Sequence, residues 1–368
     1  MEAISERQLI LIGAGFVLQA TLINVPSQII KISKQNSWFS IIPAFAVCIL
    51  SIWLIAKITS RFPHQDLFGV MVNRFKIAGR FLSSLYILFF FIILSRDIRN
   101  LTEFINIVLL QRTPLIFIAL LVMIPVVVVA RGGIEVVARM AELYFPIIVA
   151  SILILPPILL TKVQFLNFMP IFEKGLVPSL QGSWYFIGYL GDIIILPFLF
   201  SHRTFTFREG VYSLLWGSFL TEILLVLTLL VFGPNLTGRF IFPTEELVRQ
   251  IRLGDFLDRL DLVLVSVWLP TMIIRLSATL YVICHGLNQV IPNISAMTVT
   301  NSMGAFVLVC ALWFYKNNIS LLEMNRVWPF IEILFMFLIP FVLFLVIRRK
   351  KPDVQPEKQL AESEPNST

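Results

Sequence analysis

The sequence predicts an all-α polytopic membrane protein with ten transmembrane helices in a five-plus-five inverted repeat, in which the first and sixth helices are broken. Three observations support this fold class. The composition is strongly apolar, since 58% of the 368 residues are hydrophobic and only 14% are charged. The apolar residues gather in ten runs, and the first and sixth runs carry matching interruptions. A soluble protein could not bury this much apolar surface.

The ten runs have the lengths that membrane-spanning helices need. A hydrocarbon core about 30 Å thick is crossed by roughly 20 residues of helix. The third and eighth runs are long enough to tilt or to extend beyond the membrane. We therefore expect one membrane domain over residues 1–347. The runs lie near residues 8–31, 38–59, 80–111, 114–130, 136–161, 182–201, 208–233, 261–290, 297–315 and 326–347.

Basic residues mark one side of the predicted membrane. They cluster between the second and third runs and follow the fourth, sixth and tenth runs, most densely at Arg348–Lys351. The positive-inside rule then places both termini in the cytoplasm, although some of the opposite loops also carry Lys or Arg. The Pro- and Glu-rich tail over 348–368 is predicted to be disordered and cytoplasmic. Residues 243–260 have the spacing of a short amphipathic helix on the outer face.

Two of the runs are interrupted by polar residues, Gly and Pro. The first contains Leu18–Pro26 (LQATLINVP), and the sixth contains Gly188–Asp192 (GYLGD) followed by Pro197. These runs open the two halves of the chain, runs one to five and six to ten. Paired interruptions in matching halves are typical of inverted-repeat transporter folds. The alternative is a pair of unrelated kinks, which are common in membrane helices.

The breaks predict a binding site for a small molecule near the middle of the membrane. Unwound backbone is tolerated there only where it faces protein or a water-filled cavity. The N-terminus of a half-helix favours a carboxylate, and freed carbonyl groups favour an ammonium group, so a zwitterionic amino acid meets both demands. The predicted lining residues are Gln19, Ala20, Thr21 and Asn24 from the first run and Gly188, Leu190, Gly191 and Asp192 from the sixth.

Charged residues inside the runs are the other chemical signal. Asp192 stands out, because carboxylates within spans are rare and usually functional; the alternative is a cap on a half-helix that begins at Ile193. The third run carries Arg96, Asp97, Arg99 and Glu103, which must pair with one another or with other helices. A structural or subunit-contact role is favoured for these four. Glu222, Arg275 and Glu332 are lone charges, and either acid is a candidate partner for Arg275.

Four further residues share helix faces with these positions. Phe91 and Ser95, one turn before the charges of the third run, are better candidates to face the site than the charges themselves. Ser277 and Tyr281 share a face of the eighth run, and Tyr offers both a ring and a hydroxyl group to a ligand. Ordinary helix packing is the alternative for the second pair.

The sequence gives no sign of an enzyme. It contains no Gly-rich phosphate loop, no nucleophile elbow and no paired Cys or His ligands. The three cysteines, Cys48, Cys284 and Cys310, have no metal or redox spacing and are expected to pack as small apolar residues. We therefore expect neither a catalytic site nor a metal or other cofactor. The distribution of the net charge of +7 also disfavours a nucleic-acid partner.

Several short stretches together resemble the endospore germination permease family, the B subunit of spore germinant receptors, within the amino acid–polyamine–organocation superfamily. Arg131–Glu142 (RGGIEVVARMAE) is the most specific of them. The similarity extends over residues 4–347, with the stretches in the family's order and spacing. The other stretches are Ile4–Leu9 leading to Val25–Pro26, Thr102–Ile105 followed by Arg112–Pro114, and Leu257–Asp261 with Trp268.

The resemblance implies a receptor subunit in the inner membrane of the endospore that binds a small nutrient, expected to be an amino acid, and triggers germination. It implies partners, a larger A subunit and a lipoprotein C subunit. It also implies a pocket that uses Gln19–Thr21, Phe91, Ser95, Leu190, Ser277 and Tyr281. Relatives often have a Gly-Ala-Gly type sequence at the first break, so the bulkier Gln19-Ala20-Thr21 leaves less room for the ligand. The alternative function is a secondary active amino acid transporter coupled to protons or sodium.

Overall fold

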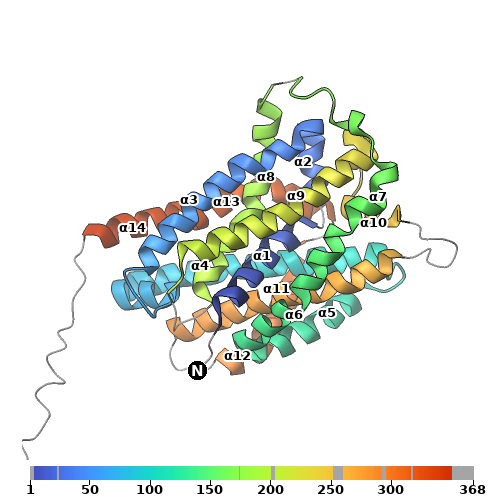
Figure 1. Cartoon of the computed structure of the whole chain (residues 1–368). Helices are drawn as coiled ribbons and strands as arrows, with labels where there is room; N and C mark the ends of the chain where they lie inside the picture. Colours follow the sequence, from blue (N-terminus) through green and yellow to red (C-terminus); the bar gives the residue numbers. More distant parts are fainter. Residues whose placement is uncertain are drawn as a thin grey trace, which may run out of the picture.

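A computed structural model describes the backbone of residues 4–22, 25–173, 175–199, 204–251, 260–291, 296–315 and 318–349 (Figure 1). Side chains are described for the same residues except 19–22, 260–264, 296–297, 318–319 and 348–349. Every regular element in these ranges is helical. The predicted disorder of the tail concerns residues that lie almost wholly outside them.

Each of the ten apolar runs is helical over most of its described residues. The first half contains α1 (Glu6–Leu22), α2 (Val25–Ser33), α3 (Ile41–Thr59), α4 (Leu67–Val108), α5 (Leu115–Arg131), α6 (Gly133–Leu153) and α7 (Leu155–Leu159). The second half contains α8 (Val177–Leu190), α9 (Phe207–Thr237), α10 (Pro243–Arg249), α11 (Leu260–Val290), α12 (Ala296–Phe314), α13 (Asn318–Ile333) and α14 (Ile339–Arg349). Short 3₁₀ segments lie at Lys34–Ser40, Leu160–Lys162, Phe165–Phe168 and Gly191–Phe198, and a π-helical turn lies at Leu334–Leu338.

The chain is a multi-pass membrane protein. Among the described residues, six helical stretches are long and apolar enough to cross a membrane, and two shorter apolar helices, 115–131 and 298–314, accompany them. The second piece of the first interrupted run, α2, belongs to one of the six stretches, Val25–Thr59, whereas α1 and the sixth run are not among the six. The count of ten crossings therefore stays a prediction.

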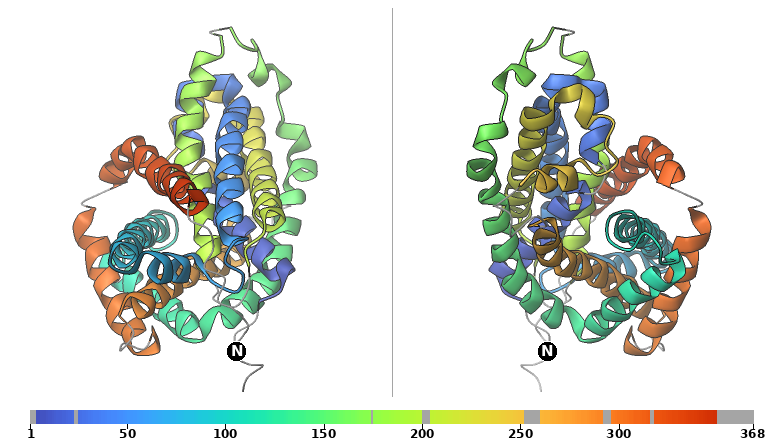
Figure 2. Two further views of the ribbon diagram at one scale, coloured as in Figure 1. Left: turned by 90° about the vertical axis from the view of Figure 1, so that its left-hand side faces the viewer. Right: turned by 90° about the vertical axis from the view of Figure 1, so that its right-hand side faces the viewer.

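The helices pack as two groups. In the first group, α1, α2, α3, α8 and α9 contact one another, and in the second, α4, α5, α11 and α12 do so. The end-on views of Figure 2 show these groups on opposite sides of the molecule, with α6 along one flank and α13 and α14 along the other. Each group takes two runs from each half of the chain, which is the arrangement that an inverted repeat produces.

The described residues differ at the two predicted interruptions. In the first run, α1 ends at Leu22 and α2 begins at Val25, and residues 23–24 between them lie outside the described ranges. In the sixth run, α8 ends at Leu190, and the chain continues as the 3₁₀ helix Gly191–Phe198 (called η4 below). The sixth helix is therefore tightened and not unwound into coil. A 3₁₀ segment inside a helix commonly marks a hinge or a functional position.

Local sequence explains several helix ends near the site. Asp66 precedes α4, and its carboxylate accepts a hydrogen bond from the Gly69 backbone N–H at 3.0 Å. Thr206 and Glu209 form a reciprocal capping box at the start of α9. Pro243 occupies the first turn of α10, where the missing N–H of proline is tolerated. Helix α10 covers the first part of the predicted amphipathic segment, whose residues 252–259 lie outside the described ranges.

Candidate ligand-binding centre

A buried ionic cluster joins the two helix groups. Asp192 of η4 accepts hydrogen bonds through Oδ2 from Arg96 Nη2 of α4 at 2.9 Å and from Arg275 Nη2 of α11 at 2.5 Å. Asp97 of α4 accepts hydrogen bonds from Arg96 Nε at 3.1 Å and from Arg275 Nε at 2.7 Å. The four side chains are at most 6% exposed. Two arginines and two aspartates balance in charge, as burial of ions requires.

Arg275 also ties the cluster to the first broken helix. Its Nη1 donates to the backbone carbonyl of Phe16 in α1 at 2.6 Å, and its guanidinium carbon lies 4.8 Å from the centre of the Phe16 ring. Nε, Nη1 and Nη2 of this arginine each donate to an acceptor, so all three nitrogens are engaged. Because Phe16 and Asp192 belong to the first helix group, Arg275 of the second group contacts both broken helices at once.

Arg96 lies between two aromatic rings. Its guanidinium carbon is 4.9 Å from the ring centre of Tyr189 and 4.7 Å from that of Trp328 in α13, distances that allow cation–π attraction. The Tyr189 hydroxyl donates to Asn325 Oδ1 at 2.6 Å, and Asn325 Nδ2 donates to Gln28 Oε1 of α2 at 3.3 Å. A polar chain therefore runs from the cluster to the helix that follows the first break.

Glu332 is the unpaired charge of this region. It is 0% exposed on α13, and neither carboxyl oxygen has a well-formed hydrogen bond within the described residues, although the Trp328 indole lies near it. Its carboxyl group lies against Gly191, since a Cβ built on that glycine would be 2.4 Å from Glu332 Cγ and 2.5 Å from Oε1. The π-helical turn Leu334–Leu338 follows directly, and π-helical turns are frequent at functional sites.

The π-helical turn is held by aromatic packing and one hydrogen bond. The Tyr86 hydroxyl of α4 donates to the Phe335 carbonyl at 2.8 Å. The Phe89 ring stacks on Phe335, with ring centres 4.4 Å apart, and lies parallel to Trp328 at 5.7 Å. The unusual backbone beside Glu332 is thus fixed against α4, the helix that carries Arg96 and Asp97.

The residues predicted from the sixth run lie at this centre. Asp192 belongs to the ionic cluster, and Gly191 contacts Glu332. A Cβ at Gly188 would approach Pro329 and Trp328 of α13 within 3.1 and 3.2 Å, so this glycine permits a close approach of α8 and α13. Leu190 is fully buried. The interpretation of Asp192 as the cap of a half-helix is wrong, because α8 passes into η4 one residue before it and its carboxylate binds two arginines.

The two predicted serines keep unused hydrogen-bonding capacity. Ser95 on α4 and Ser277 on α11 are 0% exposed, and neither hydroxyl has a hydrogen-bond partner among the described residues. Each lies within two residues of an arginine of the cluster. In the same part of the structure, Arg96 Nη1 and Asp192 Oδ1 are likewise without a partner. Such buried atoms are usually satisfied by a ligand or by ordered water.

The other predicted residues lie apart from the cluster or outside the described side chains. The Phe91 ring packs against Phe306 of α12, with ring centres 5.2 Å apart. Tyr281 is half-buried and stacks on His285, whose Nε2 is 2.9 Å from Asp66 Oδ2. Gln19, Ala20 and Thr21 occupy the last turn of α1, where only the backbone is described, and Asn24 lies outside the described residues.

One predicted pairing is wrong and another is confirmed. Arg275 pairs with Asp97 and Asp192, and not with Glu222 or Glu332. Arg99 and Glu103 do pair along α4, at 2.6 Å. Sequence reasoning assigned Arg96, Asp97 and Arg275 no role in the ligand site, because spacing along one helix does not reveal which helices meet. The available signal was the presence of ionisable residues inside three apolar runs.

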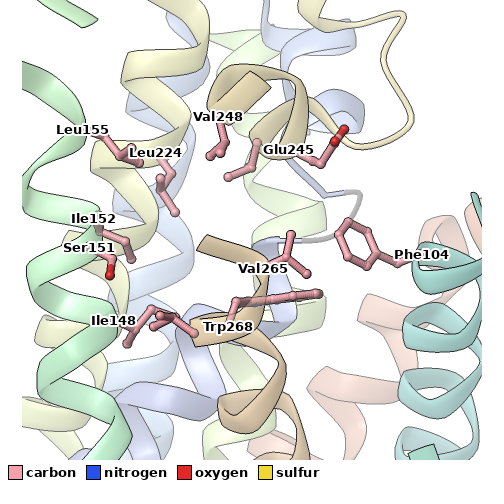
Figure 3. Close-up of a pocket in the computed structure, with 12 residues that line it drawn as sticks. Phe104, Ile148, Ser151, Ile152, Leu155, Leu224, Glu245, Val248, Val265 and Trp268 are labelled. Carbon is pink, nitrogen blue, oxygen red and sulfur yellow. The ribbon is translucent and has the colours of Figure 1, made fainter. Parts of the chain in front are cut away.

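Three cavities are lined by described residues that sequence reasoning did not select. A narrow one beside Arg275 lies between α1, α6 and α11 and is lined by Gly15, Phe16 and Thr271, among others. A wider one lies between α1, α6 and α9 near Glu6 and Arg208. The third lies beneath α10, with Phe104 and Trp268 in its wall (Figure 3).

Two solved structures that share this fold are cation-linked transporters. A nucleobase-cation-symport-1 family transporter, solved in a closed conformation with bromovinylhydantoin bound, aligns with 95% of this chain and 80% of its own, at a TM-score of 0.66 and 15% identity. A Na⁺-coupled sialic acid symporter aligns with 92% of this chain and 79% of its own, at a TM-score of 0.58 and 14% identity. The predicted fold class is thereby confirmed, the helix count apart.

Sequence comparison identifies the family. The putative spore germination protein YfkT of Bacillus subtilis is 34% identical over 95% of this chain and 98% of its own length. Spore germination protein KB of the same organism is 24% identical over 95% of each chain, and spore germination protein A2 is 25% identical over 92% and 94%. The model of the family described as spore germination protein matches residues 3–319. The chain therefore belongs to the spore germination protein (spore permease) family, as the resemblance of its motifs indicated.

Proposed function

We propose that the chain is the B subunit of a spore nutrient germinant receptor and binds a small nutrient, an amino acid in the first instance, at the centre between its broken helices. It would act from the inner membrane of the endospore, with both termini on the core side, together with an A subunit and a lipoprotein C subunit. It would carry out no catalysis and need no cofactor. Membership of a family of germination proteins supports this role.

One observation carries the proposal. At the junction of the two helix groups, buried polar atoms of opposite character keep hydrogen-bonding capacity unused: Arg96 Nη1 as a donor, Asp192 Oδ1 as an acceptor, and the hydroxyls of Ser95 and Ser277 as either. A zwitterionic amino acid supplies a carboxylate for the arginine and an ammonium group for the aspartate. Gln19, Ala20, Thr21, Asn24 and Tyr281 remain predicted contributors to the same site.

The ionic cluster suggests how binding would reach the partner subunits. Asp192 and the Phe16 carbonyl belong to one helix group, and Arg96, Asp97 and Arg275 belong to the other. A ligand that competes for Arg96 or Asp192 would bind differently when the groups shift relative to each other. Only such a difference in affinity can displace a conformational equilibrium.

The test uses spores that lack this subunit and regain it as defined variants. A panel of amino acids, sugars and nucleosides first identifies the nutrient that restores germination. Ser95→Ala and Ser277→Ala should each raise the half-maximal nutrient concentration about threefold to tenfold, the loss expected for one hydrogen bond. Ser84→Ala is the matched control, because Ser84 lies exposed on the same helix as Ser95 and bonds only within it. Unchanged half-maximal concentrations in both buried variants, at equal protein abundance, would contradict the proposed site.

A secondary active amino acid transporter, coupled to protons or sodium, is the second candidate. The fold that the chain shares with two cation-linked transporters favours it. Uptake of a labelled amino acid into proteoliposomes that contain this chain alone, driven by a proton or sodium gradient, would support it. Nutrient binding to the same proteoliposomes without uptake would support the receptor.

A further inference from the structure

The cavity beneath α10 lies away from the ionic centre. It is lined by Ile148 and Ile152 of α6, by Leu155 of α7 and by Val265 and Trp268 of α11, with Val248 of α10 above and Phe104 of α4 beside it (Figure 3). It contains about 640 Å³ of empty space, part of which is open at its mouth. Trp268 is seven residues before Arg275, so the cavity begins about 10 Å along α11 from the ionic cluster.

The walls of this cavity are apolar. Ile148, Ile152, Leu155 and Leu224 are all at most 5% exposed, which makes the enclosed space an environment for a hydrocarbon body. Two rings fix the wall beside Trp268: Phe104 meets the indole edge to face at 4.8 Å and meets Phe242 in the same way at 5.1 Å. Packing of this kind holds aromatic rings in one orientation.

Two polar side chains in the wall are already engaged. Glu245 forms an ion pair with Arg249, and the Ser151 hydroxyl donates to the Ile147 carbonyl at 2.8 Å. Trp268 Nε1 and Thr244 Oγ1 are buried and have no hydrogen-bond partner among the described residues. The indole N–H can only donate, so what it lacks is an acceptor. A buried donor without an acceptor is destabilising. Trp268, which carries this donor, is about nine-tenths buried.

We propose that this cavity is a second binding site, for an uncharged molecule with an apolar body and one hydrogen-bond acceptor such as a ketone or ester carbonyl. Trp268 Nε1 and the Thr244 hydroxyl donate to the acceptor, and the aliphatic side chains of α6, α9 and α10 hold the body. Charged ligands are disfavoured because the one carboxylate among the described residues of the wall is paired with Arg249. A free small molecule and the ester end of a membrane lipid share this chemistry.

The position of the cavity allows its occupant to affect how the two helix groups are placed relative to each other. Leu224 belongs to the first helix group, and Phe104, Val265 and Trp268 belong to the second. A molecule bound there contacts both groups and α10, so it binds more tightly to one relative position of the groups than to another. Occupancy at this site therefore changes the equilibrium between those positions, independently of what the ionic centre binds.

The experiment uses the purified full-length chain in detergent and benzophenone, an apolar ketone that forms covalent adducts with nearby C–H bonds under near-ultraviolet light. Mass spectrometry of peptides locates the adducts. We expect saturable labelling in residues 148–155, 244–248 and 265–268. Acetophenone, which keeps the carbonyl acceptor, should suppress that labelling at lower concentration than ethylbenzene, which has a similar shape and no acceptor.

Variants separate the cavity from the lipid-facing surface. Ile152→Trp and Val248→Trp fill the space and should lower cavity labelling at least tenfold, whereas Val309→Trp, at a position 58% exposed on α12, should not. Trp268→Phe keeps the ring and removes the donor, so acetophenone should compete about fivefold more weakly. Trp313→Phe, at a position 78% exposed, is the matched control.

The outcomes distinguish the possibilities. Suppression of labelling by added diacylglycerol, an uncharged lipid with ester carbonyl groups, assigns the site to lipid, and its absence assigns it to small molecules; both support the site. Labelling that does not saturate, or that acetophenone and ethylbenzene suppress equally, overturns the proposal even if the filled variants fail to fold, because these measurements use the unmodified chain. None of these readouts depends on germination, so the proposed receptor function stands or falls separately.

Discussion

Arg275 and Glu332 belong to one buried centre and differ in the partners of their side chains. Arg275 is 1% exposed and donates to two aspartates and a backbone carbonyl. Glu332 is 0% exposed and has no well-formed hydrogen bond in the described part of the chain. A paired ion can be buried in a membrane protein, whereas an unpaired carboxylate is strongly disfavoured there. The Arg275 end therefore holds the fold, and the Glu332 end is best suited to a neutral carboxyl group.

The largest expected effect comes from Arg275→Met. This change leaves Asp97 and Asp192 with one arginine fewer between them and removes the donor to the Phe16 carbonyl, so the apparent free energy of unfolding should fall by about 3–5 kcal/mol. Thermal unfolding in detergent measures the loss. Arg7→Met is the control, because Arg7 is 71% exposed and should tolerate the change. Equal stability of the two variants would show that the cluster is dispensable for the fold.

Asp192→Asn should have a smaller effect. The amide keeps the shape and can still accept one hydrogen bond, but it loses the charge that two arginines share, and a loss of about 2–3 kcal/mol is expected. The same unfolding assay applies. A variant as stable as the unmodified chain would mean that Asp97 alone satisfies both arginines.

Gly191→Ala tests the contact that joins the two ends. The backbone of Gly191 is helical, with φ of −64°, so alanine is conformationally allowed and any loss comes from its Cβ meeting Glu332. We expect a loss of about 1–3 kcal/mol, reduced when Glu332→Ala is introduced in the same chain. Gly15→Ala is the matched control, since nothing lies within 4 Å of its Cβ. Strictly additive losses in the double variant would show that a Cβ at position 191 and the Glu332 side chain do not interact.

Glu332→Gln should have the smallest effect on stability. If the carboxyl group is neutral in the folded chain, an isosteric neutral amide changes the free energy of unfolding by less than about 1 kcal/mol. Its loss is compared directly with that of Asp192→Asn, which changes a paired carboxylate of the same centre. A loss as large as that of Asp192→Asn would indicate an ionised, paired Glu332 and end the contrast between the two regions.

The sequence predicted the helices of this fold better than the contacts between them. The apolar runs and the change of helix type at Gly191 follow from local composition, because Gly, Pro and polar residues weaken a membrane helix where they occur together. Asp192 was recognised as important for the same reason. Its two arginine partners lie 96 and 83 residues away, on helices whose contact no local pattern encodes.

By itself, the sequence determined a multi-pass helical protein of the spore germination family, with two broken helices and charges placed inside the spans. Only the tertiary structure decided that Arg275 pairs with Asp97 and Asp192, while Glu332 has no well-formed hydrogen bond among the described residues. It also decided that a cavity lies beneath α10. Helix formation and membrane crossing depend on residues within a few turns of one another. Ion pairing and cavity formation depend on which helix faces touch, and the packing of the two groups sets those contacts.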